Sequence, residues 1–176
     1  MTKSLLIFVA LFTLSCSSEN EKRAISKAGG ESVITLERAK YRLQYPSTWQ
    51  IDANEDGYDL DNRFSLYPPY KNAVCMFFLL DAVLDEEKFM NDQVNAQLEK
   101  TIKNGKVTYF ERWGSLKGHG ANISGRFLGI FKGKFRVFCR STDSSTFMVV
   151  HQYPDRIEDR ILPQLQKIES AFKLKK

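Results

Sequence analysis

The sequence contains few residues of the kinds that bind transition metals, with two histidines and three cysteines among 176 residues. His119 lies in the glycine-flanked stretch KGHGAN, which predicts a turn, and His151 lies in a predicted strand beside apolar residues. A zinc site needs about three converging nitrogen, sulfur or oxygen ligands. Because neither histidine has a partner at a ligand-like spacing, the sequence predicts no zinc site.

Motifs for nucleophilic catalysis and for phosphate binding are also missing. The chain has no Gly-x-Ser-x-Gly elbow and no glycine-rich phosphate loop. Ser124, in NISGR, alternates with Asn122 and Arg126 on the polar face of a predicted strand. Glu86 and Glu87 begin a predicted helix, where the helix dipole favours negative charge without any catalytic role. We therefore predict that the protein is not an enzyme.

The chain has a single long apolar run, SLLIFVALFTL, which follows Lys3. A basic residue before an apolar run too short to span a bilayer is typical of an export signal. The run ends in TLSC, which resembles the lipobox of bacterial lipoprotein signal peptides. This resemblance implies that residues 1–15 are removed, that Cys16 carries lipid, and, with Ser17 next, that the protein sits on the outer membrane facing the periplasm. The alternative is an ordinary secretory peptide cut elsewhere.

The rest of the chain predicts a tether followed by one domain. Residues 16–32 are polar and lack hydrophobic periodicity, which favours a flexible linker, and residues 33–176 suffice for one core. Without residues 1–15 the chain has 25 basic and 21 acidic residues, a net charge of +4. We interpret the basic residues as scattered solubilising charge. The alternative is a membrane-surface contact by a small basic area made of Lys132, Lys134, Arg136 and the terminal KLKK. No nucleic-acid partner is therefore expected.

The stretch AVCMFFLL predicts a strand buried on both faces. Cys75, Phe77 and Leu79 alternate with Val74, Met76, Phe78 and Leu80, so elements must cover the strand on both sides. Residues 85–103 predict a helix that could supply one cover, with an aspartate at the N-cap and Met90, Val94, Leu98 and Ile102 on one stripe. Gly105 follows as a stop signal.

Four further strands and a closing helix follow this helix. The predicted strands are residues 106–113, 121–132, 134–140 and 146–153, with FKGKF as a tight hairpin in which Gly133 takes positive φ. Short connections of this kind predict an antiparallel meander. Residues 155–172 carry apolar side chains at helical spacing, interrupted by Pro163, which predicts either a kink or a new helix starting at the proline.

Two cysteines lie in apolar, strand-like stretches of the predicted domain. Cys75 and Cys139 are an even pair in a chain expected to enter an oxidising compartment, which allows a disulfide. A bridge requires Cα atoms within about 7 Å, a condition that only the tertiary structure decides. The alternative is two buried free thiols, which behave as small apolar side chains.

The acidic stretch DANEDGYDLDN begins like a calcium loop. Asp52, Asn54 and Asp56 occupy the first, third and fifth positions, and Asp59 could add a further oxygen ligand. However, Arg63 stands at the twelfth position, where a calcium loop supplies a bidentate glutamate, and strands rather than helices flank the stretch. We therefore favour a solvated hairpin loop, with calcium binding as the alternative and no other cofactor expected.

The stretch YRLQYPSTWQI forms an aromatic-Pro-x-x-Trp corner after a predicted strand, and the chain closes with IESAFKL. These features, with the strand, helix, meander and helix order, resemble the PsbP, Mog1 and DcrB-like group over residues 33–174. The resemblance implies a three-layer α/β/α sandwich around an antiparallel sheet. It also implies a fold whose members mostly bind other proteins, among them photosystem II subunits, a small-GTPase partner and periplasmic lipoproteins.

Three aromatic residues are candidates for a partner contact. Tyr67 and Tyr70 flank the proline-stiffened loop YPPYKN, and Trp113 ends a predicted strand beside a glycine-rich loop. The alternative is that these rings fold back onto the edge of the core. We predict a lipid-anchored envelope protein that acts by binding a protein partner, as an accessory or assembly factor. The competing hypothesis is a calcium- or small-ligand-binding module that uses the acidic loop.

Overall fold

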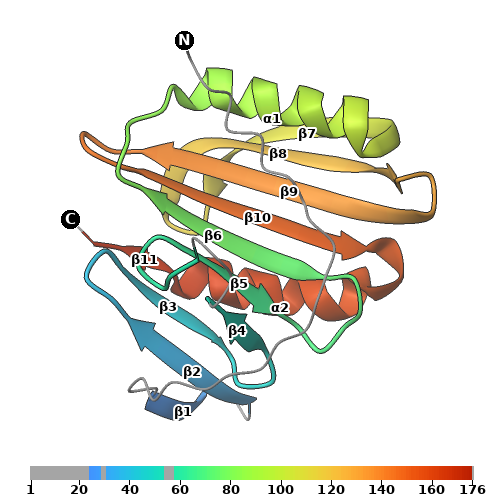
Figure 1. Ribbon diagram of the computed structural model, residues 1–176. Coiled ribbons are helices and arrows are strands. Elements are labelled where there is room, and N and C mark those ends of the chain that lie inside the picture. The colour runs from blue at the N-terminus through green and yellow to red at the C-terminus, as the bar shows by residue number, and fades with distance from the viewer. Residues whose placement is uncertain (1–23, 29–30, 54–57, 176) are drawn as a thin grey trace.

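The computed structural model describes residues 24–28, 31–53 and 58–175, which form two antiparallel sheets and two helices (Figure 1). The larger sheet has the order β4 (Gln50–Asp52), β5 (Arg63–Tyr67), β6 (Val74–Leu80), β10 (Thr146–Pro154), β9 (Phe131–Ser141), β8 (Leu116–Phe127) and β7 (Ile102–Trp113). The smaller sheet has the order β1 (Ala24–Ala28), β2 (Glu31–Glu37), β3 (Tyr41–Pro46) and β11 (Lys173–Leu174). The helices are α1 (Glu86–Lys100) and α2 (Glu158–Ala171), the latter preceded by a 3-10 turn, Asp155–Ile157.

Strand β6 is buried on both faces, as the sequence predicted. Cys75 and Phe77 belong to the core that includes α2, whereas Met76 and Phe78 belong to the core that includes α1. Figure 1 shows the two helices on the two sides of the large sheet. Burial of one phenylalanine side chain stabilises a fold by roughly 1.5–3 kcal/mol, so these two cores hold the layers together.

The predicted α/β/α sandwich around an antiparallel sheet is confirmed, with one addition. The smaller sheet lies beside α2, and the inward side chains of β3, Tyr41, Leu43 and Tyr45, share a core with Ile161 and Leu165 of α2. The C-terminal strand β11 pairs with β3, so the chain end is joined to the start of the fold. Among the described residues, no helix is long and apolar enough to cross a membrane.

Helix α1 begins where the sequence predicted but ends earlier. The Asp85 carboxylate accepts a hydrogen bond from the Lys88 backbone at 3.0 Å, which caps the helix. Thr101 closes the last turn, and Ile102 already pairs with Phe127 in the sheet. Gly105 is therefore not the end of the helix but lies inside β7, because pairing with β8 extends the strand back to the end of α1.

Helix α2 carries Pro163 within its length. The helix runs unbroken from Glu158 to Ala171, so the prediction of a separate helix starting at Pro163 is wrong. Pro163 is exposed, whereas Ile161 and Leu165 are buried against the sheet. Its missing N–H therefore removes one helix bond on the solvent side, while the apolar stripe stays intact.

The turn between β8 and β9 differs from the prediction. It lies at residues 128–130, where Leu128 and Gly129 have φ values of 48° and 73°, and Gly133 lies inside β9. A Cβ atom at position 133 would crowd the ring of Phe127, so the glycine there serves close packing rather than a turn. The sequence pattern could not reveal this turn, because Leu128 has a positive φ although it is not a glycine.

The predicted flexible tether, residues 16–32, is only partly described. Ala24–Ala28 form β1 and pair antiparallel with Glu31–Thr35 of β2, so this part of the tether prediction is wrong. A short edge strand without a hydrophobic run leaves little periodicity to recognise, which is why the sequence favoured a linker. The predicted signal peptide, residues 1–15, and the predicted lipid site, Cys16, lie outside the described residues.

Candidate functional site

Strands β7, β8 and β9 carry a concentrated positive charge. Residues 102–141 contain nine Lys and Arg and a single acid, Glu111, a net charge of +8, whereas the whole chain has +5. The remaining residues together are therefore net negative. The interpretation of the basic residues as scattered charge is thus wrong, and counting charges by segment would have revealed the concentration.

Six of these nine cations lie on the face of the strands that α1 does not cover. Ala121, Ile123 and Val137 point into the core beneath α1, and the alternating positions point the other way. On that second face, Lys106 and Arg126 are exposed and Lys134 is half-buried. The three strands therefore present an open basic surface, which we call the basic face, with members Lys103, Lys106, Arg126, Lys132, Lys134 and Arg136.

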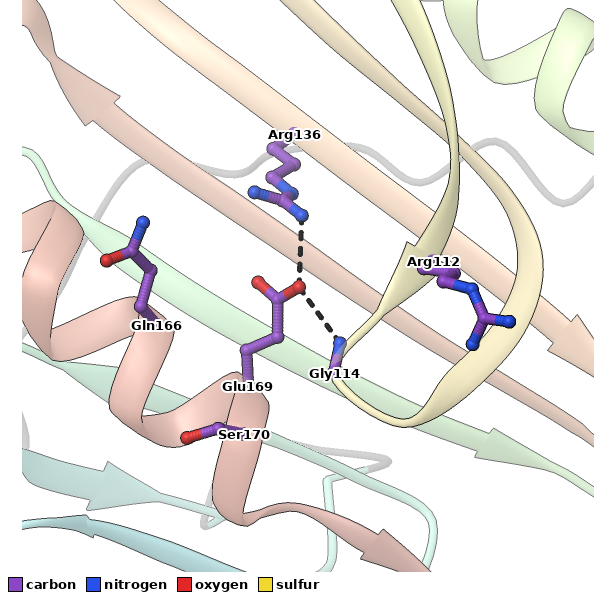
Figure 2. A pocket seen from close by; sticks show the side chains of 6 residues that line it. All are labelled: Arg112, Gly114, Arg136, Gln166, Glu169 and Ser170. Atoms are coloured by element: carbon purple, nitrogen blue, oxygen red, sulfur yellow. Dashed lines mark hydrogen bonds and ion pairs between the residues drawn. The ribbon is translucent and has the colours of Figure 1, made fainter.

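A pocket of about 360 Å³ lies where the basic face meets the end of α2. Its lining residues come from β7, β9 and α2 and from the turn after β7: Arg112, Gly114, Arg136, Gln166, Glu169 and Ser170. Figure 2 shows Arg136 and Glu169 pointing toward each other across this pocket. The pocket thus joins segments far apart in the sequence, and two arginines and one glutamate are among its lining residues.

Glu169 organises the pocket. Its Oε1 atom accepts a hydrogen bond from the backbone N–H of Gly114 at 2.9 Å and pairs with Nη2 of Arg136 at 3.2 Å (Figure 2). Arg136 also stacks on Phe110, with its guanidinium carbon 4.4 Å from the ring centroid. Both partners of the ion pair are largely buried, so the pair is screened less by salt than a surface pair.

A group of buried polar atoms lies beneath the pocket. Nε2 of His151, Nε1 of Trp113 and Nε of Arg136 are buried without a hydrogen-bond partner in the described part of the chain. The Trp113 and His151 rings meet edge to face at 6.2 Å, and His151 lies opposite Arg136 in the sheet. Unpaired buried polar atoms are costly, so this is the least satisfied polar region of that core.

Burial and the Arg136 charge lower the pKa of His151 to about 3. Because desolvation is the larger cause, the imidazole is neutral at physiological pH. The prediction that His151 lies in a strand beside apolar residues is confirmed. The ring is fully buried, with only 1% of the residue exposed, whereas its place near the sheet end indicated partial burial. His151 therefore acts as a neutral packing side chain under the basic face.

His119 lies elsewhere and has another partner. It belongs to strand β8, so the predicted turn around KGHGAN is wrong. Its Nδ1 atom lies 3.0 Å from Glu86 of α1, and the same carboxylate accepts a hydrogen bond from the backbone of Ser141 at 2.7 Å. Glu86 and His119 thus fasten the start of α1 to β8 and β9.

The two cysteines of the domain are buried free thiols. Cys75 belongs to the core beneath α2 and Cys139 to the core beneath α1, and β10 separates their strands. Two strand spacings of about 4.8 Å place the thiols beyond disulfide reach, so the bridge that the sequence allowed is not formed. Burial raises the pKa of Cys139 to about 12 and raises that of Cys75 well above its usual value.

The three aromatic candidates for partner contact lie against the core. Trp113 is fully buried, so its predicted role as an exposed contact is wrong. Tyr70 is partly buried, and its hydroxyl accepts a hydrogen bond at 3.3 Å from Gln164, which also accepts one from Nε1 of Trp49 at 2.6 Å. Tyr67 is half-buried in β5. The alternative that these rings fold back onto the core edge is confirmed for Trp113 and Tyr70.

The acidic loop joins β4 to β5 as a hairpin, the arrangement that the sequence favoured. The carboxylate of Asp59 accepts hydrogen bonds at 2.7 Å from the backbone N–H groups of Asp61 and Asn62, which turns the chain. Asp52 ends β4, and two of the predicted calcium ligands, Asn54 and Asp56, lie outside the described residues. No group of three or more His, Cys, Asp or Glu converges within the described ranges.

No protein-family model matches the chain, and no curated protein matches it in sequence. The chain is similar in structure to the cyanobacterial PsbP protein CyanoP from Synechocystis, with a TM-score of 0.55 and 12% identity over 85% of this chain and 98% of that one. The chain has a PsbP-like fold. At this identity the likeness concerns the PsbP-like fold alone and gives no site residue.

A second similar structure comes from Bacteroides thetaiotaomicron, with a TM-score of 0.49 and 12% identity. The match covers 78% of this chain and 46% of that one, so the chain spans less than half of that protein. The PsbP-like fold therefore rests on the comparison with CyanoP and on the order of elements described above.

Proposed function

We propose that this protein is a non-catalytic accessory or assembly factor of the bacterial cell envelope, held by lipid on Cys16 at the outer membrane and facing the periplasm. It acts by binding an acidic segment of a partner protein at the pocket end of the basic face. The observation that carries the proposal is the net charge of +8 on strands β7 to β9, with two arginines, Arg112 and Arg136, lining the pocket.

The charge distribution supports an acidic partner. A surface of one sign attracts a partner of the opposite sign over a Debye length, about 8 Å at physiological salt, and speeds the encounter. Arg112 is exposed at the pocket and forms no ion pair within the described ranges, so its guanidinium group is available to a carboxylate. Arg136, already paired with Glu169, supplies a fixed second positive group.

The ionisable groups near the pocket have structural roles that agree with binding rather than catalysis. Glu169 holds Gly114 and Arg136, and burial keeps His151 neutral at physiological pH. Burial also raises the pKa of Cys75, so its thiol stays protonated and is a poor nucleophile. These groups fix the shape of the surface that a partner would meet.

Site-specific photocrosslinking in intact cells tests the proposal. A photoreactive residue at Gln166, which is exposed and lines the pocket, should capture an acidic envelope protein, whereas the same residue at Asn91 of α1 should not. Arg112→Glu should abolish the adduct at position 166, and the matched reversal Lys88→Glu on α1 should leave it unchanged. Equal adducts at both positions, or an adduct that survives Arg112→Glu, would contradict the proposed surface.

The lipid anchor has its own test. Metabolic labelling with radioactive palmitate should mark the natural chain and should be lost in Cys16→Ala. Labelling that persists in Cys16→Ala would reject the anchor while leaving the proposed partner contact open to the crosslinking test.

A further inference from the structure

The turn between β8 and β9 presents two exposed apolar side chains. Leu128 is 57% exposed and Ile130 is 73% exposed, the largest exposed fraction among the large apolar residues in the described ranges. Figure 1 shows this turn at the end of the β8–β9 hairpin, next to the end of α1. Single exposed apolar residues are common on protein surfaces. Leu128 and Ile130 therefore indicate a binding surface only if the shape and charge around them also do.

The turn is held in a fixed shape. The Arg126 guanidinium donates hydrogen bonds to the carbonyl oxygens of Gly129 at 3.1 Å and Ile130 at 3.4 Å. The backbone N–H of Leu128 donates to the carbonyl of Thr101 at 2.7 Å, which fastens the turn to the end of α1. These bonds keep the Leu128 and Ile130 side chains outward, so little conformational entropy is lost when they bind a surface.

A row of three cations stands directly behind the turn. Lys103 pairs with Arg126 and Arg126 pairs with Lys132 across β7, β8 and β9, and all three are exposed. None of them forms an ion pair within the described part of the chain. Like charges at directly opposed positions of a sheet destabilise it, so this arrangement favours an external anion.

We propose that the β8–β9 turn is a membrane contact, in which Leu128 and Ile130 enter the headgroup region of an anionic bilayer and Lys103, Arg126 and Lys132 meet lipid phosphates. Two exposed apolar side chains on a rigid turn, with three cations behind them, fit the interface of an anionic bilayer. Apolar side chains can enter the headgroup region there, and the anionic headgroups attract cations. An acidic protein would match the charge but not the protruding apolar pair. The pocket of the proposed function lies at the other end of β8, so the two surfaces are separate.

Fluorescence quenching of the full-length Cys16→Ala chain by brominated lipids tests this contact, because this variant lacks the proposed lipid, which would bind vesicles of any charge. Ile130→Trp places a reporter on the turn, and the native Trp49 and Trp113 are buried, so their emission is shielded from lipid. With vesicles of phosphatidylglycerol and phosphatidylcholine in equal parts, the emission of the new tryptophan should fall roughly twofold. Vesicles of phosphatidylcholine alone should quench it much less, because they lack the anionic charge.

Two variants control for non-specific contact. Val83→Trp places the reporter on an exposed apolar position before α1, at the other end of that helix, and should not be quenched. Lys103→Gln with Lys132→Gln, in the Ile130→Trp chain, should weaken anionic vesicle binding at the turn by about fivefold for each cation removed. Arg126 is left in place because it shapes the turn.

Three results of the vesicle experiment would overturn the membrane contact. These are unquenched emission at position 130, equal quenching at positions 83 and 130, and equal quenching with neutral and anionic vesicles. A shift of the emission at position 130 on adding polyglutamate but not vesicles would also overturn it, in favour of an acidic protein ligand. Loss of the crosslink at position 166 would not change the quenching of the tryptophan at position 130 by anionic vesicles. The partner-binding proposal and the membrane-contact proposal can therefore fail independently.

Discussion

At the scale of single residues, Glu169 and His151 explain how the pocket is built. Glu169 joins the turn after β7 to β9. Burial, and to a lesser extent the negative charge of Glu169, raise the pKa of Cys75. His151 fills the space beneath Trp113 as a neutral ring. Glu169 and His151 therefore each have a packing role and an electrostatic role. A substitution that keeps the size of the side chain but removes its ionisable group can separate the two roles.

The depressed pKa of His151 predicts a loss of stability in mild acid. The unfolded chain takes up a proton below the unperturbed pKa of 6.5, whereas the folded chain does so only near 3. The stabilising contribution is therefore complete above 6.5 and falls as the pH drops from 6.5 toward 3. Between pH 7 and pH 5 the free energy of unfolding should decrease by roughly 2 kcal/mol from this group.

Urea denaturation at pH 7 and pH 5 measures this decrease, and His151→Gln is the control. The variant should lose about 2 kcal/mol less stability between the two pH values than the natural chain, because it has no imidazole to protonate. An equal loss in both chains would show that other groups cause the acid sensitivity.

At the scale of elements, the last turn of α2 rests on the turn after β7. Gly114 has a φ of 56°, and a Cβ atom there would overlap the backbone carbonyl oxygen of Glu169. The same glycine donates its N–H to the Glu169 side chain. Helix α2 therefore reaches its place on the sheet only because residue 114 lacks a side chain.

Gly114→Ala should lower the free energy of unfolding by about 3 kcal/mol or more, since it combines backbone strain with a clash against α2. Gly129→Ala is a matched control, because Gly129 has a φ of 73° but open space around its Cβ position. It should cost about 1–2 kcal/mol, the strain alone. Chemical denaturation of both variants measures the difference, and equal losses would show that the contact with α2 does not matter.

At the scale of the whole molecule, the two helices and the large sheet seal each thiol in its own core. Cys75 and Cys139 are fully buried on opposite faces of the sheet, and burial raises the pKa of both thiols. Neither thiol can meet a reagent unless the layers separate. Thiol reactivity therefore reports on opening of the entire sandwich.

In the full-length Cys16→Ala chain, both remaining thiols should react with a disulfide reagent at least about a thousandfold more slowly than in denaturant. A reducing agent should leave the melting temperature unchanged, because no bridge exists to break. Thiol absorbance assays and thermal melts measure these two effects. Immediate reaction of either thiol, or a melting temperature lowered by reductant, would contradict the structure.

Periodicity made the layers predictable from particular residues. The two apolar faces of β6 required covers on both sides, and Asp85 together with the stripe containing Met90 and Val94 indicated one of them. The β8–β9 turn escaped prediction because Leu128 adopts a conformation that usually signals glycine. The pocket escaped because Arg112, Arg136 and Glu169 are distant in sequence and converge only through sheet pairing and the packing of α2.

The sequence by itself determined the two-sided burial of β6, the antiparallel strand order of the meander and the amount of charge, because local periodicity and composition carry these properties. Only the tertiary structure decided that Cys75 and Cys139 lie on opposite faces and that Lys103, Arg126 and Lys132 stand in one row. Strand register causes this difference, since a shift by one residue moves every side chain to the other face.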